Sequence, residues 1–281
     1  MLYWLSAFSD TIGPLNVLRY ITFRTGGAMF TALVLVFLLA PYVMAVLGVR
    51  QVRPMRSAGL IILSALLIAT LLWANLANGY VWIVLAVALG FGFVGLRDDY
   101  LEAARQSGLS VKVRIALAAG IASVACLALV HLGRPQTATS LSVPFGKEFD
   151  LGWLYIPLAA FIIVAAGNIV NLADRLYGFV IGPLLPVGLS FGLISWFAGN
   201  SVLAHYLNIR FVPGVGELAV LCGAVTGAGL GFFWFNAPPA SIFLGATGSL
   251  ALGGMFGAVA VATKHEVVLA VIYGLFVTAL G

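Results

Sequence analysis

GFGFVGLRDDYLE, residues 90–102, is the stretch in which a long apolar run meets two adjacent carboxylates, Asp98 and Asp99. The pattern predicts an apolar helix that ends at these two acids. A helix C-terminus carries partial negative charge, so two acids there cost about 0.3–1 kcal/mol each and repel one another. We therefore expect a compensating partner. It is either Mg²⁺ bridging to a phosphate, or a short helix over 100–106 that the acids cap from the aqueous side.

The composition defines the class of protein around this stretch. Hydrophobic residues make up 62% of the 281 residues and charged residues only 8%, and the mean hydropathy is +1.12. So little polar surface cannot cover a soluble core, and the chain is predicted to be an all-α polytopic membrane protein. The net charge of +5 comes from basic residues scattered singly. This scatter favours a membrane location and predicts no nucleic-acid partner.

Apolar runs long enough to cross a hydrocarbon core of about 30 Å predict eight full transmembrane helices. They cover residues 25–47, 57–76, 80–96, 114–132, 153–172, 178–197, 217–235 and 248–263. A ninth run, 267–281, is shorter than the roughly 20 residues of a full crossing, so we expect it to end inside the bilayer or to be truncated. Residues 1–23 are rich in aromatics and predict an amphipathic interfacial segment. Together, residues 1–281 form one predicted transmembrane domain.

The loops between the predicted spans indicate which end faces the cytoplasm. One side collects Arg50, Arg53, Arg56, Arg97, Arg105, Lys112, Arg114 and Arg175. The other side collects Arg19, Arg24, Arg134, Lys147, Arg210 and Lys264. The first loop holds three arginines close to the spans, where the positive-inside rule counts most. The more basic side, which also carries Asp98, Asp99, Glu102 and Asp174, is therefore predicted to be cytoplasmic.

Six stretches resemble, in order, the bacterial phospho-N-acetylmuramoyl-pentapeptide transferases. They are NVLRYITFRTGGA, GLRDDY, VPF at 143–145, GNIVNLADRLYG, GAGLGFFWFNAPPA and FLGATGSLALGG. The resemblance covers nearly the whole chain and implies the polyprenyl-phosphate hexosamine-1-phosphate transferase family. Its members are multi-pass bacterial inner-membrane enzymes with ten helices, so this chain would be a form truncated at its C-terminus. They use Mg²⁺ to transfer phospho-N-acetylmuramoyl-pentapeptide from UDP to undecaprenyl phosphate, which yields lipid I for peptidoglycan.

The resemblance also implies roles for particular residues and partners. Asp98, Asp99 and Asp174 fall on catalytic positions, and Asp98 and Asp99 are the implied Mg²⁺ ligands. The implied substrate-binding residues are Asn168, Asn171, Lys112, Arg114 and Asn236. From spacing alone, Asn168 and Asn171 could instead satisfy each other and a neighbouring helix. The implied partners are membrane lipid, undecaprenyl phosphate and UDP-N-acetylmuramoyl-pentapeptide, with a homodimer as a further expectation.

The chain departs from the family pattern where chemistry would take place. The family's aspartate in a Phe-x-Gly-Asp motif, understood as a magnesium ligand, is Ala246, and a methyl group cannot coordinate a hard cation. A second family aspartate, after Asp174, is Tyr177, and a family glycine between them is Arg175. The family's histidine-rich cytoplasmic loop would follow residue 281. These departures predict impaired or absent activity.

Three functions stay open at this point. The first is a working transferase, which the motif framework supports and Ala246 opposes. The second is a non-catalytic homologue that binds lipid or nucleotide sugar, or a remnant without function. The third is a transporter, favoured only by polar residues within the membrane, which gather at one interface rather than along a pore. For the first two we expect Asp98, Asp99 and Asp174 to converge with Lys112 and Arg114 in one cleft.

Overall fold

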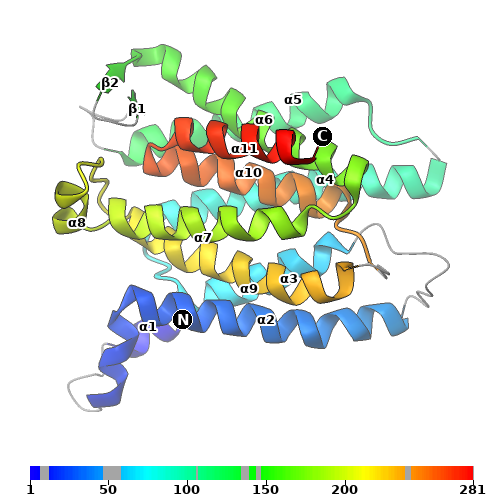
Figure 1. Cartoon of the computed structure of the whole chain (residues 1–281), viewed down its shortest axis with the longest axis horizontal. Coiled ribbons are helices and arrows are strands. Elements are labelled where there is room, and N and C mark those ends of the chain that lie inside the picture. Colours follow the sequence, from blue (N-terminus) through cyan, green and yellow to red (C-terminus); the bar gives the residue numbers. More distant parts are fainter. Residues whose placement is uncertain are drawn as a thin grey trace.

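The computed structural model describes residues 1–6, 13–46, 58–105, 107–133, 139–143, 147–237 and 242–280. Within them the chain is a bundle of long helices with one short hairpin of strands (Figure 1). Seven helices of this described part are long and apolar enough to cross a membrane. The predicted all-α polytopic membrane protein is confirmed.

The helices follow the predicted apolar runs. The seven long ones are α2 (Ile21–Val46), α4 (Gly79–Arg105), α5 (Val111–Leu132), α6 (Tyr155–Tyr177), α7 (Ile181–Ala198), α9 (Leu218–Asn236) and α10 (Gly245–Thr263). Two more apolar helices, α3 (Gly59–Trp73) and α11 (Glu266–Leu280), have 15 residues each. The shorter ones are α1 (Leu2–Leu5), α8 (Ser201–Tyr206) and the 3-10 turns Gly13–Arg19, Gly152–Leu154 and Val215–Glu217. The second predicted span is thus shorter than a full crossing of roughly 20 residues.

Helix α10 forms the centre of the bundle. All its residues from Ala246 to Thr263 are buried, and it packs against α4 and α6. Glycines make this contact close: a Cβ added to Gly253 would lie 2.6 Å from a backbone oxygen of α6, and one on Gly257 would lie 2.8 Å from a backbone carbon of the same helix. Small residues at helix contacts are how helices associate in lipid, where the hydrophobic effect between them is absent.

The antiparallel helices give the bundle two ends. Helices α4, α6 and α9 finish, and α5, α7 and α10 begin, at the end that carries Asp98, which we call the aspartate end. The opposite end carries β1 (Ser140–Val143) and β2 (Lys147–Asp150), paired antiparallel with Ser140 opposite Asp150. We call it the hairpin end.

Helix α4 does not end where the apolar pattern predicted. It continues without a break through Asp98 and Asp99 to Arg105, well past the expected end at residue 96. The expected helix terminus at the two acids and the separate helix over 100–106 are therefore wrong. The reason is tertiary: other elements supply hydrogen-bond donors to both carboxylates, so the helix has no need to stop and expose them to water.

The structure bears on four of the basic residues that were used to predict the orientation. The loop that contains Arg50, Arg53 and Arg56 lies outside the described residues, so the sidedness of the chain stays a prediction. Arg24, expected in a loop, lies inside α2 and is 1% exposed. The helix begins four residues before the predicted span because Glu217 pairs with Arg24 and makes a charge inside the bundle tolerable.

Candidate site at the aspartate end

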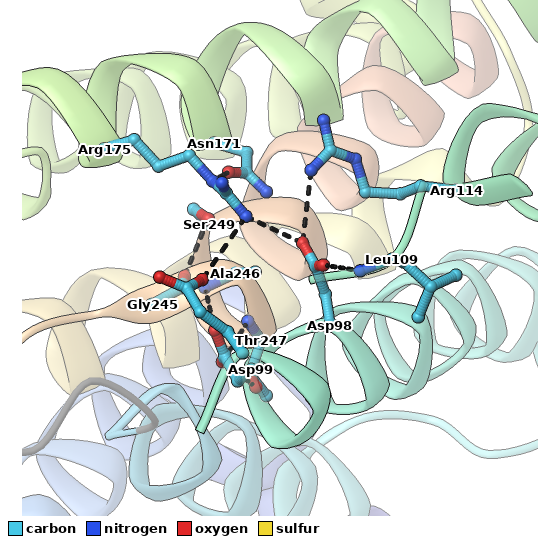
Figure 2. Close-up of polar contacts among 11 residues, drawn as sticks. Asp98, Asp99, Leu109, Arg114, Asn171, Arg175, Gly245, Ala246, Thr247 and Ser249 are labelled. Atoms are coloured by element: carbon cyan, nitrogen blue, oxygen red, sulfur yellow. Dashed lines mark hydrogen bonds and ion pairs between the residues drawn. The ribbon is translucent and has the colours of Figure 1, made fainter. Parts of the chain in front are cut away.

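Asp98 is a fully buried carboxylate between two guanidinium groups. Its Oδ2 accepts hydrogen bonds from Arg175 Nη2 at 2.8 Å and from Arg114 Nη1 at 3.1 Å (Figure 2). Its Oδ1 accepts from the backbone N–H of Leu109 at 2.6 Å. The turn before α5 can approach this closely because residue 108 is a glycine, whose Cβ would lie 2.5 Å from Asp98 Oδ1. Charge-assisted bonds of this kind stabilise a buried anion that would otherwise be costly.

Asp99 caps a helix other than its own. Its Oδ1 accepts from the backbone N–H of Ala246 at 2.9 Å, and its Oδ2 accepts from Thr247 N at 2.9 Å and Thr247 Oγ1 at 2.6 Å. The first amides of α10 have no partner within the helix, and its N-terminus favours an anion. Gly95, one turn earlier on α4, lets the backbones touch, since a Cβ there would lie 2.2 Å from Ala246 O. Asp99 thus joins α4 to α10.

Helix α6 brings the third group of polar side chains. Arg175 Nε donates to Asn171 Oδ1 at 3.0 Å, and Arg175 Nη2 lies 3.8 Å from Glu102 Oε2. The side chain of Arg175 is 45% exposed, although its partner Asp98 is buried. Asn171 is buried, and its Nδ2 has no hydrogen-bond partner among the described residues. A guanidinium has five N–H donors, so Arg175 keeps donors beyond its bonds to Asn171 and Asp98.

A cavity of about 310 Å³ opens where α4, α6 and α10 meet. It is lined by Asp99, Glu102, Asp174, Arg175, Gly178, Phe243, Gly245 and Ala246. Asp174 is buried on the last turns of α6. The structure therefore brings three of the predicted site residues, Asp98, Asp99 and Asp174, to one place, and Arg114 joins them through Asp98.

The remaining predicted site residues have other surroundings. Lys112 is exposed on the first turn of α5. Asn168 Nδ2 donates to the carbonyl of Val164 within its own helix at 2.8 Å. Asn236 is buried, and its Nδ2 donates to Gly178 O at 3.2 Å and to Ile242 O at 2.9 Å. Asn168 and Asn236 thus donate hydrogen bonds to backbone carbonyl groups. The spacing allowed Asn168 to pair with Asn171, but Asn168 bonds to Val164 instead and Asn171 bonds to Arg175.

The residues present do not fit a magnesium ion at this position. Mg²⁺ demands oxygen ligands at about 2.1 Å in near-octahedral geometry. Both oxygens of Asp99 accept hydrogen bonds from the start of α10, and two guanidinium groups share one oxygen of Asp98. Ala246 adds only a methyl group to the cavity wall. Among the described residues, no three His, Cys, Asp or Glu side chains are placed to hold a metal ion.

Sequence reasoning used Arg175 as one of the charges that predict orientation and as a departure from a pattern, and it missed the contacts that this residue makes. Arg175 and Asn171 are four residues apart on one helix, and this spacing predicts the contact that the structure shows. The bonds to Asp98 and from Thr247 to Asp99 join positions 77 and 148 residues apart, and no local pattern signals them. Arg175 therefore belongs to the candidate site, together with Arg114, as a positive group beside Asp98.

The fold and the acid-and-arginine cluster define a multi-pass helical membrane protein with a charged candidate site at one end. Residues 81–264, more than half of the chain, match Glycosyl transferase family 4. The chain is 56% identical to the phospho-N-acetylmuramoyl-pentapeptide-transferase of Rhodopseudomonas palustris strain BisB18 and 55% identical to that of strain BisA53. Each match covers 99% of this chain and 83% of the relative. The chain therefore belongs to the phospho-N-acetylmuramoyl-pentapeptide-transferase family.

Proposed function

We propose that this chain binds the phosphorylated substrates of its family at the aspartate end without transferring the sugar phosphate between them. One observation carries the proposal: the ion pair of Arg175 with Asp98 at 2.8 Å, at a position where the resemblance implies glycine. The pair engages the carboxylate that a metal would need. It also leaves a partly exposed guanidinium on the cavity wall.

The proposed ligands are UDP-N-acetylmuramoyl-pentapeptide and undecaprenyl phosphate, which the sequence resemblance implies; the names of the two relatives specify the phospho-N-acetylmuramoyl-pentapeptide group. Arg175 suits a phosphate oxygen because a guanidinium is a planar, always charged donor that matches phosphate geometry. The basic residues Arg97, Lys112 and Arg114 near the same end favour a cytoplasmic location for it, in a bacterial inner membrane. Binding of this kind needs no metal ion.

Transfer of the sugar phosphate requires more of the site than substrate binding does. A phosphate oxygen that attacks a diphosphate approaches an anionic centre, and the enzyme must stabilise charge at the reacting atoms. Arg175 donates hydrogen bonds to Asp98 and Asn171, so the position of its guanidinium group is set by these two side chains and not by a substrate. A displacement of about 1 Å at a reacting group can cost on the order of a hundredfold in rate. We infer that transfer by this chain is slower than its relatives' by orders of magnitude.

The test separates binding from turnover. The chain is placed in nanodiscs with undecaprenyl phosphate, Mg²⁺ and UDP-N-acetylmuramoyl-pentapeptide, and exchange of radiolabelled UMP into the nucleotide sugar is followed. We expect no exchange above background, while equilibrium binding of the nucleotide sugar persists in EDTA. Robust exchange by the unmodified chain would show that the arginine-paired site is competent.

Two matched variants test the role of Arg175 in binding. Arg175→Met should weaken nucleotide-sugar binding about tenfold, as expected for a lost charge-assisted hydrogen bond. Arg97→Met removes the same charge from an exposed position on α4 near the same end and should leave binding unchanged. Equal effects of the two substitutions would mean that net charge alone attracts the ligand.

A further inference from the structure

A second polar cavity lies at the hairpin end, across the bundle from Asp98. Its volume is about 210 Å³, and its lining includes two basic residues, Arg210 and Lys264, and two tyrosines, Tyr80 and Tyr155. The rest of the wall is largely apolar and includes Leu129 and Leu132 of α5. The proposed function makes no use of this cavity.

The described lining residues of this cavity include two cations and no carboxylate. Lys264 is 9% exposed, and its Nζ lies 3.8 Å from the centre of the Tyr155 ring. Glu266, which interacts electrostatically with Lys264, is 1% exposed and accepts a hydrogen bond from Tyr155 Oη at 2.5 Å, but it is not among the lining residues of the cavity. Burial lowers the pKa of Lys264 to about 8; the charge of Glu266 opposes this shift, and the charge of Arg210 adds to it more weakly. Burial makes the charged form of Lys264 less favourable, and an anion bound in the cavity would stabilise that form.

An apolar groove between α4 and α5 lies next to the same cavity along both helices. The groove has a volume of about 370 Å³ and is lined by Ile83, Ala86, Val87, Gly120, Ile121, Val124, Ala125 and Ala128. Positions 80, 83 and 87 of α4, and 121, 125, 128 and 132 of α5, follow helical spacings of three and four and therefore share one face of each helix. Tyr80 and Leu132 line the cavity, so groove and cavity are consecutive along both helices.

The groove faces the bilayer. Val124 is 68% exposed in the middle of a helix that is long enough to span the membrane, so the solvent around it is lipid. The stretch of α5 from 120 to 128 is about 12 Å long at 1.5 Å per residue. An ion from water would need only the basic cavity, whereas a lipid would use the hydrocarbon-lined groove as well.

We propose that groove and cavity together bind one anionic lipid, with its phosphate headgroup between Arg210 and Lys264 and a hydrocarbon chain between α4 and α5. The two cations supply charge-assisted donors to the phosphate oxygens. The left-handed backbone of Lys264, with φ of 61°, turns the chain sharply at the end of α10. The site lies at the opposite end of the bundle from the aspartates and does not rest on the function proposed for them.

Native mass spectrometry of the detergent-solubilised chain tests the proposal, with dioleoyl phosphatidic acid and dioleoyl phosphatidylcholine supplied in equal amounts. We expect phosphatidic acid to be retained about tenfold more strongly, as for a charge-assisted contact. Arg210→Gln and Lys264→Asn should each remove most of this preference. Asparagine is chosen because it tolerates a left-handed backbone. Arg19→Gln removes an exposed cation near the start of α2, at the same end, and should keep the preference.

A further variant tests the groove without touching a charge. A Cβ at Gly120 would meet nothing within 4 Å, so Gly120→Leu can fold normally while its side chain fills the groove. We expect it to reduce retention of phosphatidic acid about as much as Arg210→Gln does. Equal losses in Arg210→Gln and Arg19→Gln would overturn the proposal in favour of general surface charge. Displacement of the lipid by inorganic phosphate, with no effect of Gly120→Leu, would overturn it in favour of a free-phosphate site.

Discussion

Two arginine–carboxylate pairs lie at opposite ends of this bundle, and they differ in how completely they are enclosed. Arg24 meets both oxygens of Glu217, at 2.7 and 2.6 Å, with side chains that are 1% and 11% exposed. Arg175 meets Asp98 at 2.8 Å, and here the carboxylate is 1% exposed but the arginine is 45% exposed. One pair is closed and the other is open toward a cavity.

The surroundings of the closed pair explain what it can do. The ring of Tyr3 lies 4.7 Å from the guanidinium carbon of Arg24, and the backbone N–H of Asn75 donates to Glu217 at 3.1 Å. These contacts join the N-terminal segment, α2, the turn after α3 and the start of α9. They leave no face of Arg24 for a ligand, so the pair holds the fold together. Burial of an ion pair therefore does not mark a binding site, whereas an arginine with donors toward a cavity is a candidate for one.

The largest effect should come from breaking the closed pair. Arg24→Met leaves the buried carboxylate of Glu217 without its partner, and a buried charge without compensation typically costs about 3–5 kcal/mol. We expect a strongly lowered free energy of unfolding, measured by chemical unfolding in detergent micelles.

A second substitution shows whether the cost comes from the unpaired charge. Arg24→Met combined with Glu217→Gln removes both charges, so it should recover much of the lost stability. A single Arg24→Met variant as stable as the wild-type chain would mean that the pair is not a structural lock.

A smaller loss should follow when the open pair is broken. Asp98→Asn removes a buried anion from between Arg175 and Arg114, but both arginines keep some access to water, with side chains 45% and 13% exposed. Leu109 N can still donate to the amide oxygen of the new side chain. We expect a loss of about 1–3 kcal/mol in the same unfolding measurement. A loss as large as that of Arg24→Met would show that the aspartate end is as closed as the hairpin end.

The sequence predicted the helices well because each of them needs a long apolar run to cross the membrane. It failed at charged positions inside helices. We predicted that Arg24 lies in a loop because its partner, Glu217, is 193 residues away along the chain. The end of α4 was misplaced for the same reason, since a pair of acids looks like a terminus until their distant donors are known.

The candidate site was predicted in part. Asp98, Asp99 and Asp174 were singled out, and they do lie at one end of the bundle around one cavity or beside it. What the pattern could not supply is their partners. Asp99 binds amides of Ala246 and Thr247, and backbone amides carry no sequence signal. Whether a residue serves a ligand or the fold depends on such contacts, which only the three-dimensional arrangement defines.

Removal of divalent metal should have the smallest effect, and it tests the open pair most directly. Because protein donors already engage Asp98 and Asp99, we expect the unfolding temperature of the wild-type chain to be the same in EDTA and in Mg²⁺. Arg175→Gly combined with Ala246→Asp removes the guanidinium and adds a carboxylate beside the cavity. This variant should gain Mg²⁺-dependent stability, about 2.7 kcal/mol at a metal concentration 100 times the Kd. Ala246→Asp alone should gain less, since the new carboxylate can pair with Arg175. An equal Mg²⁺ response in the wild-type chain would show that the metal displaces these donors, and that the arginine does not stand in its place.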